Sequence, residues 1–206
     1  MKIIDISWPI SNEMTTYKDG DDISIEKIQS FKTNSVREHR LSISSHIGTH
    51  IDAPAHFLQD GATLDQIALE TLVGPCRVLD FTNIKEQITE EALIPHTIKT
   101  NDRILLKTKN SLLSSTDSFN YSFVYLDETG AHYLAKQKVR CVGIDYLGIE
   151  RCQPNHKSHI ALLSKKIPII EGLRLEQVEP GNYQLYCLPL LIPGLEGCPA
   201  RAVLIS

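Results

Sequence analysis

The chain has 206 residues, which is enough to bury one substantial hydrophobic core. Its 42% hydrophobic and 22% charged residues are typical of a soluble globular protein. The net charge of −4, without a basic run or an apolar run of transmembrane length, argues against nucleic-acid and membrane partners. Asp5 comes too early for the core of a signal peptide, so we expect a cytoplasmic protein.

The five cysteines are odd in number and form no Cys-x-x-Cys motif. This pattern argues against a disulfide framework and against a structural cysteine–zinc site. We expect most of them to be small buried apolar residues. Cys198 is expected in a loop, where it is either a small filler or a thiol that faces a pocket.

Apolar runs predict the elements of the first half of the chain. A polar, turn-rich loop is expected over residues 14–22. The strands expected at 23–28 and 36–43 could pair as a hairpin, and the second of them leads directly into the segment that begins at residue 46. Thr63 is a capping-type residue and predicts a short helix, which Gly74-Pro75 would end. The expected elements are strands at 3–6, 23–28, 36–43, 77–81 and 103–107, and short helices at 63–70 and 89–93.

In the second half, strands alternate with helices. Asp127 is expected to cap an amphipathic helix, and Asp145 either lines a site or caps the next turn. The expected elements are strands at 123–126, 139–144, 167–170, 185–190 and 202–205, and helices at 127–137 and 155–165. Since several strands are hairpin-like, we predict one mixed α/β domain over residues 1–206, with a mixed sheet and short flanking helices.

One stretch concentrates chemistry-bearing side chains. Three of the eight histidines, His46, His50 and His56, fall within eleven positions, together with Asp52. Imidazole nitrogens and carboxylate oxygens are the ligands that Zn²⁺ and other divalent first-row metals prefer. The stretch therefore predicts a metal site.

The spacing restricts the backbone of this stretch. On a helix, Asp52 would lie on the side opposite to His46 and His50. On a fully extended strand, the same residues share a face, but His46 and Asp52 would be roughly 20 Å apart. We therefore predict a strand that bends back on itself, with Gly48 giving the backbone freedom and Pro54 fixing the exit.

Two later residues could complete the site. His159 lies on the helix expected near residue 155, and Glu171 stands where an apolar strand stops. Strand ends are common places for sites, because a rigid element holds the side chain. His156 is an alternative to His159, since spacing does not separate the two.

The stretch His46-x-Gly48-Thr49-His50-x-Asp52-x-Pro54-x-His56 resembles the signature of the cyclase family of metal-dependent hydrolases, which includes bacterial kynurenine formamidase and isatin hydrolase. The likeness extends over nearly the whole chain. Its other landmarks are Gly143-Ile144-Asp145, His159 with Glu171-Gly172-Leu173, and Gly194-x-x-Gly197-x-Pro199-x-Arg201-Ala202. In the N-terminal loop, Tyr17-Lys18-Asp19-Gly20-Asp21 keeps the family's aromatic residue but lacks its Pro-Gly-Asp.

The resemblance implies a role for each matching residue. His46, His50 and Asp52 would bind a first metal ion. Asp52, His159 and Glu171 would bind a second ion, with both carboxylates able to bridge. His56 would be the acid/base residue, and Tyr17 would touch substrate. The resemblance also implies a swivelling β/β/α fold and a homo-oligomer, either a dimer or a tetramer.

The ligand set predicts one or two divalent ions, with Zn²⁺ first and Mn²⁺ or Co²⁺ as alternatives. A metal-bound hydroxide would attack a small amide, and His56 would transfer the proton. The expected substrate is an aryl formamide of the N-formylkynurenine type. The alternatives are ring opening of a cyclic amide or lactone and a non-catalytic protein that binds a metal or small molecule. The chain has no Gly-x-Ser-x-Gly elbow, which argues against a serine hydrolase.

Overall fold

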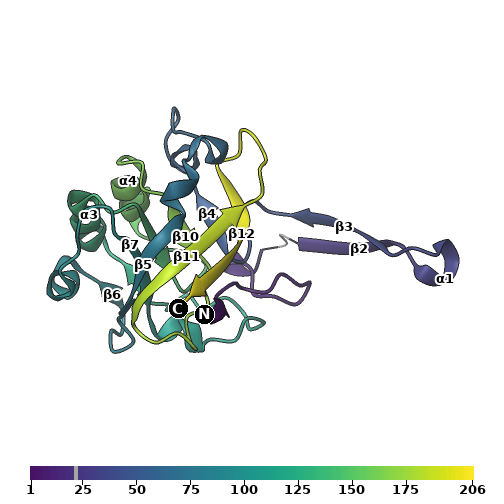
Figure 1. The fold of residues 1–206 in the computed structure, drawn as a ribbon, viewed down its shortest axis with the longest axis horizontal. Helices are drawn as coiled ribbons and strands as arrows, with labels where there is room; N and C mark the ends of the chain where they lie inside the picture. The colour runs from purple at the N-terminus through teal and green to yellow at the C-terminus, as the bar shows by residue number, and fades with distance from the viewer. Residues whose placement is uncertain (21–22) are drawn as a thin grey trace.

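The computed structural model describes residues 1–20 and 23–206. Its central sheet has the strand order β1-β12-β11-β5-β7-β9-β10-β4, and β4 pairs again with β12, so seven strands close a ring (Figure 1). The strands are β1 (Ile3–Asp5), β4 (His50–Asp52), β5 (Val73–Asp80), β7 (Arg103–Lys107), β9 (Cys141–Ile144), β10 (Ile169–Glu171), β11 (Gly181–Pro189) and β12 (Gly197–Ile205).

The sheet is mixed, as predicted. Strands β5, β7, β9 and β10 run parallel to one another, and the other pairings are antiparallel. Strand β12 closes the ring by changing partners along its length: residues 197–199 pair with β4, and residues 203–205 pair with β1. Every strand of the closed ring contributes side chains to one buried cluster. Its members include Ile51, Val78, Leu105, Cys141, Ile170, Leu185 and Leu204.

Short helices cover the parallel strands, at the left of Figure 1. They are α2 (Glu90–Leu93), α3 (Glu128–Gln137) and α4 (Lys157–Leu163). Leu134 of α3 and Leu162 of α4 are fully buried in a cluster with Ile104 of β7. Asp127 caps α3 as predicted, because its side chain accepts a hydrogen bond of 2.8 Å from the backbone N–H of Gly130. Two short strands, β6 (Gln87–Ile88) and β8 (Tyr125–Leu126), pair beside these helices.

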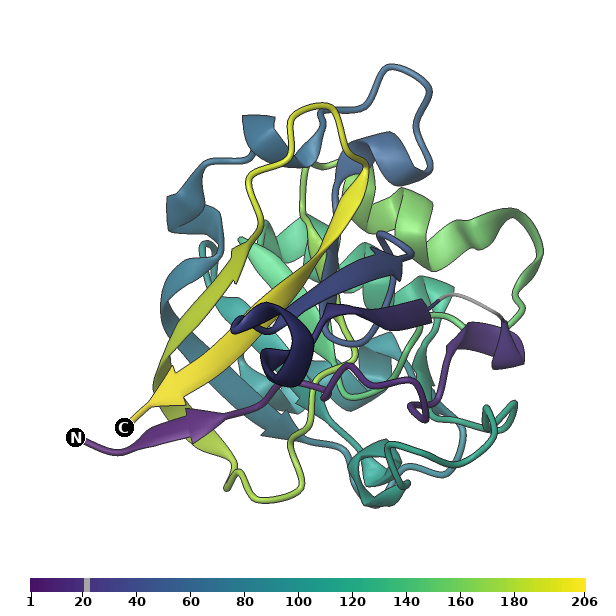
Figure 2. The ribbon, with the colours of Figure 1, turned by 90° about the vertical axis from the view of Figure 1, so that its right-hand side faces the viewer.

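A hairpin projects from the body at the right of Figure 1, and in Figure 2 it points toward the viewer. This arm consists of β2 (Ile23–Gln29), α1 (Phe31–Asn34) and β3 (Glu38–Ile43). The predicted pairing of the two strands is confirmed, with Ile23 opposite Ile43. The arm exposes large apolar side chains to solvent, among them Phe31 (62%) and Leu41 (58%).

The helix predicted over residues 63–70 is wrong. Two 3-10 turns, Leu64–Gln66 and Leu69–Thr71, stand in its place, and Ile67 between them is extended. Thr63 is the N-cap of the first turn, and the backbone N–H of Leu64, which would have no partner within a helix, donates to Leu195 on a distant loop. Gly74-Pro75, expected to end this helix, lies inside β5.

Other boundaries also differ from the prediction. The strand expected at 123–126 is only Tyr125–Leu126 and lies outside the main sheet. The helix expected from residue 155 begins at Lys157 after a 3-10 turn, because Asn155 and His156 both have a positive φ. In the histidine stretch, only His50–Asp52 forms a strand. The bend lies before it, at Gly48 with φ +57, and Pro54–His56 is a 3-10 turn.

Asp145 neither lines the cavity nor caps the turn that follows it, but binds the earlier 3-10 turn at Lys109–Leu112. It is fully buried and accepts hydrogen bonds from the backbone N–H and hydroxyl of both Thr108 and Ser111. Cys198 lies in β12 and not in a loop, and it is a buried apolar residue with 1% exposure. Three more cysteines are buried, whereas Cys152 is exposed.

The N-terminal segment between β1 and the arm is a loop as expected, with one 3-10 turn at Tyr17–Asp19. The last two residues of the predicted loop, Asp21 and Asp22, lie outside the described residues. Among the helices that the structure describes, none combines the length and the apolar character needed to cross a bilayer.

Candidate metal centre

Two neighbouring strands and one helix carry the predicted ligands. His50 and Asp52 are two positions apart on β4, so their side chains point to the same side of the sheet. Glu171 ends β10 and lies directly opposite His50 in the antiparallel pairing. His159 lies on α4, and His46 lies in the bend before β4. The fold thus brings together residues that are 125 positions apart in the sequence.

A close backbone approach fixes this geometry. Gly172 has φ +68, and a Cβ atom placed on it would overlap the carbonyl of Gly48. The hydroxyl of Thr49 donates a 2.5 Å hydrogen bond to the Gly172 carbonyl and accepts one of 2.7 Å from the backbone N–H of Trp8. Gly172 is therefore needed, because only a residue without a side chain permits the two segments to lie this close.

The donor atoms converge on Asp52. His46 Nδ1 lies 2.8 Å from Asp52 Oδ1, and His50 Nε2 lies 3.6 Å from the same oxygen. His159 Nε2 lies 3.6 Å from Asp52 Oδ2 and 3.3 Å from Glu171 Oε1. His50 Nε2 lies 3.4 Å from Glu171 Oε2. All five predicted ligands therefore form one connected group.

The carboxylates of this group are deeply buried, with Asp52 1% and Glu171 4% exposed. Burial alone would raise the pKa of Asp52, but the hydrogen bonds to His159 and His46 hold it well below its usual value. Burial likewise disfavours the charged form of His50, yet the hydrogen bond to Glu171 and the charge of Asp52 raise its pKa to about 9. The site is therefore strongly attractive to positive charge.

The donor set fits a divalent cation. Across residues 1–20 and 23–206, every ion-pair partner of Asp52 and Glu171 is a histidine. A buried carboxylate is costly unless a cation compensates it. One ligand atom each from His50, Asp52 and Glu171 lie within 4.8 Å of one another, and the same holds for His46, Asp52 and His56. Two ions that share Asp52 could be held by this arrangement.

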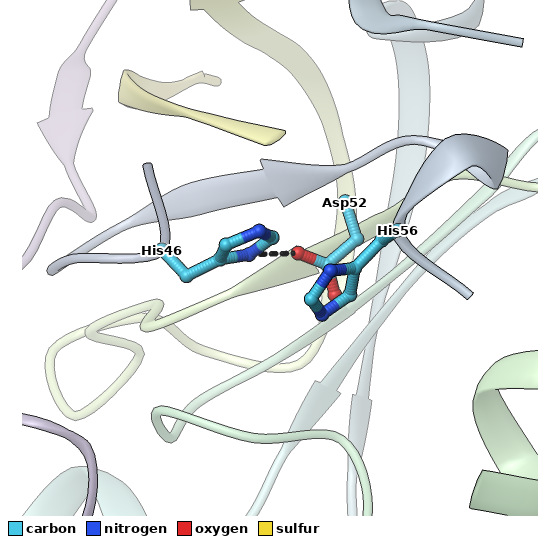
Figure 3. Close-up of side chains that lie close together, drawn as sticks. All are labelled: His46, Asp52 and His56. Carbon is cyan, nitrogen blue, oxygen red and sulfur yellow. Dashed lines mark hydrogen bonds and ion pairs between the residues drawn. The ribbon is translucent and has the colours of Figure 1, made fainter. Parts of the chain in front are cut away.

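His56 stands beside the group. Its ring stacks on His46 with a centroid distance of 3.9 Å, and Figure 3 shows both imidazoles directed toward Asp52. Burial lowers its pKa below the usual value. The geometry leaves His56 free to act either as a ligand or as an acid/base residue.

Each of the three histidines predicted as ligands has a second contact on its other ring nitrogen. His50 Nδ1 lies 2.9 Å from the Gly48 carbonyl oxygen, and His46 Nε2 lies 3.3 Å from Glu196 Oε1. His159 Nδ1 lies 3.3 Å from Glu150 Oε1. Sequence reasoning missed both glutamates. Glu196 stands within the C-terminal signature, which was a usable signal, whereas nothing in the local sequence marks Glu150.

The group opens into a cavity of about 420 Å³. Tyr17, Phe57 and Leu147 give it apolar walls, and Lys18 is the one lysine or arginine among the described residues that line it. The Tyr17 ring packs on Phe119 at a centroid distance of 5.1 Å. His156, the alternative to His159, also lines the cavity but contacts Glu150 instead of Asp52 or Glu171. A cavity of this size and character suits a small, partly apolar molecule.

The family model described as "Putative cyclase" matches residues 4–151. Kynurenine formamidase of Bacillus anthracis is 32% identical over 205 residues, which cover 98% of this chain and 97% of that protein. A solved structure described as a potential metal-dependent hydrolase with cyclase activity is 39% identical, with a TM-score of 0.90 and coverage of 98% and 96%. Isatin hydrolase A of Ralstonia solanacearum is 21% identical and shares the fold, with a TM-score of 0.84 over 100% of this chain and 92% of that one.

Proposed function

The chain belongs to the cyclase family, and from this membership we propose that it is a metal-dependent hydrolase of a small amide. The observation that carries the proposal is the convergence of three histidines and two carboxylates at the base of a cavity. The preferred substrate is an aryl formamide of the N-formylkynurenine type. Its support is the kynurenine formamidase relative, which aligns over nearly the full length of both chains.

We assign the ligands as the resemblance implies. His46, His50 and Asp52 would hold one ion, and Asp52, His159 and Glu171 the second, with the carboxylates as bridges. The contacts of His46 and His50 with Asp52, and of His159 with Asp52 and Glu171, support the assignment. A mixed set of imidazole and carboxylate ligands favours Zn²⁺, with Mn²⁺ as an alternative. Residues 1–206 would act as one domain.

The chain's residues would divide the chemistry between them. A divalent ion, when bound, lowers the pKa of water toward neutrality and polarises a carbonyl oxygen. His56 would accept a proton from the attacking water and donate it to the leaving amine. Its stacking on His46 keeps the imidazole at the edge of the ligand group. Tyr17 and Phe57 would pack against the aromatic part of the substrate.

The first test is hydrolysis of N-formylkynurenine by chain that has been stripped with a chelator and refilled with Zn²⁺ or Mn²⁺. We expect turnover only with metal, at a kcat/KM of about 10⁴ M⁻¹s⁻¹ or more. Loaded chain that leaves the formamide intact would remove this substrate. Isatin, a cyclic amide, belongs in the same assay because the fold is shared with isatin hydrolase A.

The His56→Ala variant separates an enzyme from a binding protein. We expect it to retain its metal and to lose turnover by about 10²-fold or more, because the proton transfer loses its carrier. His132→Ala is the matched control, since His132 is 64% exposed on α3, outside the cavity lining. Unchanged turnover in His56→Ala would exclude His56 from the mechanism, and loss of metal would make it a ligand.

We also propose that the chain forms a homo-oligomer through the projecting arm. An isolated two-stranded hairpin is only marginally stable in water, so a second copy would stabilise it. Residues 23–43 carry four basic and two acidic side chains, a formal charge of +2, while the whole chain carries −4. The remaining residues are thus at −6, and the arm of one copy is complementary in charge to the body of another. The cytoplasmic location expected from the sequence stays a prediction.

A further inference from the structure

Glu150 is a buried carboxylate directly behind the ligand group. It lies on the turn between β9 and α4, and its residue is 4% exposed. Its Oε2 accepts hydrogen bonds from the backbone N–H of Ser158 (3.0 Å) and of His159 (3.3 Å), at the start of α4. One oxygen of Glu150 is therefore occupied by the helix end.

The other oxygen, Oε1, faces two histidines. His156 Nδ1 lies 2.8 Å from it, and His159 Nδ1 lies 3.3 Å from it. His156 is 58% exposed on its side chain, whereas the His159 side chain is 8% exposed and its ring packs against Phe57 at 4.5 Å. Glu150 thus connects the solvent-facing histidine with the buried ligand histidine.

The His159 ring presents its nitrogens to two different surroundings. Nε2 faces Asp52 and Glu171, while Nδ1 faces Glu150. Within the described part of the chain, Nδ1 completes no well-aligned hydrogen bond, although it is buried. A buried ring nitrogen without a partner is costly, and Glu150 Oε1, 3.3 Å away, is a carboxylate oxygen that faces it.

We propose that Glu150 is a positioning residue for His159: its carboxylate accepts the Nδ1 proton and so keeps Nε2 unprotonated and directed at the cation. This inference rests on the proposed metal centre and not on the identity of the substrate. Partners behind a metal-bound histidine fix its tautomer and ring orientation, and their loss typically weakens metal binding by about 10–100-fold.

A purely structural role, capping of α4, makes a different prediction, and Glu150→Gln separates the two. Gln can keep its oxygen toward the backbone N–H groups of Ser158 and His159, so the cap and the fold are retained. Its NH₂ group then faces His159 Nδ1 as a donor, which favours the tautomer protonated on Nε2. In Glu150→Gln we therefore expect the positioning of the His159 ring to be lost and the cap of α4 to be retained.

Glu128→Gln is the matched control. Glu128 is a 44% exposed carboxylate that forms a 2.8 Å ion pair with Lys157 at the start of the same helix. The Glu128→Gln variant removes the same charge near α4, but residue 128 lies outside the cavity lining. The unfolding midpoints of the metal-free variants, measured alongside, show whether each chain is folded.

The experiment is titration of the full metal-free chain with Zn²⁺ against a competing chelator, followed by ¹⁵N NMR of the His159 ring in the zinc-loaded chain. We expect Glu150→Gln to bind Zn²⁺ about 10–100-fold more weakly, and Glu128→Gln to bind within twofold of wild type. The wild-type ring should carry its proton on Nδ1.

Three outcomes would overturn the inference. The first is an equal Zn²⁺ affinity in wild type and Glu150→Gln. The second is a His159 ring that is protonated on Nε2 in the zinc-loaded wild type. The third is a Zn²⁺ stoichiometry that falls by one ion in Glu150→Gln while the tautomer of His159 is unchanged, which would make Glu150 a ligand. Wild-type chain that binds Zn²⁺ without hydrolysing the formamide removes the substrate proposal and leaves this inference standing.

Discussion

Gly197 shows how one backbone position holds the imidazole of His46, a proposed ligand, in place. A Cβ atom at this residue would lie 2.5 Å from Cε1 and 2.9 Å from Nε2 of His46, so the imidazole packs directly on the bare backbone of β12. The same ring reaches Asp52 with Nδ1 and Glu196 with Nε2. Any side chain at residue 197 must therefore displace the His46 ring.

We accordingly predict that Gly197→Ala destabilises the chain by about 1–3 kcal/mol and weakens Zn²⁺ binding, because overpacking forces the ring off its position. Chemical denaturation and zinc titration measure the two effects. Gly194→Ala is the control: its positive φ of +84 adds backbone strain, but no atom lies within 4 Å of the added Cβ. Equal zinc affinities in the two variants would contradict the prediction.

Three of the five candidate ligands were predictable from one stretch, where their residue types and spacing are visible, whereas spacing did not separate His159 from His156. His46, His50 and Asp52 follow from their density, and the structure gathers them as expected. Glu150 could not be found in this way. Its only signal is three-dimensional, namely a carboxylate buried behind His159, and sequence spacing carries no record of such a contact.

At the scale of elements, prediction succeeded where the signal is local and failed where distant segments decide. The helix α3 has its cap, its length and its apolar face within eleven residues, and it forms as predicted. The segment 63–70 has a valid cap as well, yet its second residue bonds to Leu195 and Gly194 bonds to Asp65. These contacts tie the segment to the loop before β12, and the backbone is extended at Ile67 and Ala68, where a continuous helix would need helical angles.

The arm offers a test of assembly at this scale. Ser24 lies opposite Ser42 in the hairpin, so replacing residues 25–41 with Asn-Gly gives a short two-residue turn. We expect the body to fold unchanged and the oligomer to dissociate, because the exposed apolar side chains of the arm are removed. Light scattering coupled to size exclusion gives the mass. An equally large assembly without the arm would place the interface elsewhere.

At the scale of the whole molecule, the proposed ligands come from segments that meet only in the folded chain. A cation that binds them therefore stabilises the native state alone. With free Zn²⁺ at 1,000 times its Kd, the expected stabilisation is about 4 kcal/mol, which raises the Tm by about 10 °C for a chain of this size. Differential scanning calorimetry of chelated and loaded chain measures it.

The Asp52→Asn variant is the control for this prediction. Asp52 contacts His46, His50 and His159, so its charge is central to the proposed site. We expect its Tm to respond little to added Zn²⁺. A Tm that rises equally in wild type and in Asp52→Asn would show that the ion binds elsewhere.

The closure of the sheet by β12 has a consequence for folding during synthesis on the ribosome. Strand β4 carries two of the proposed ligands, and both of its neighbours, β10 and β12, come more than a hundred residues later in the chain. At about 5–20 residues per second, β4 emerges many seconds before either partner exists. Residues 46–56 therefore remain unpaired during most of synthesis. We expect the cation to bind late, after nearly all of residues 1–206 have been synthesised.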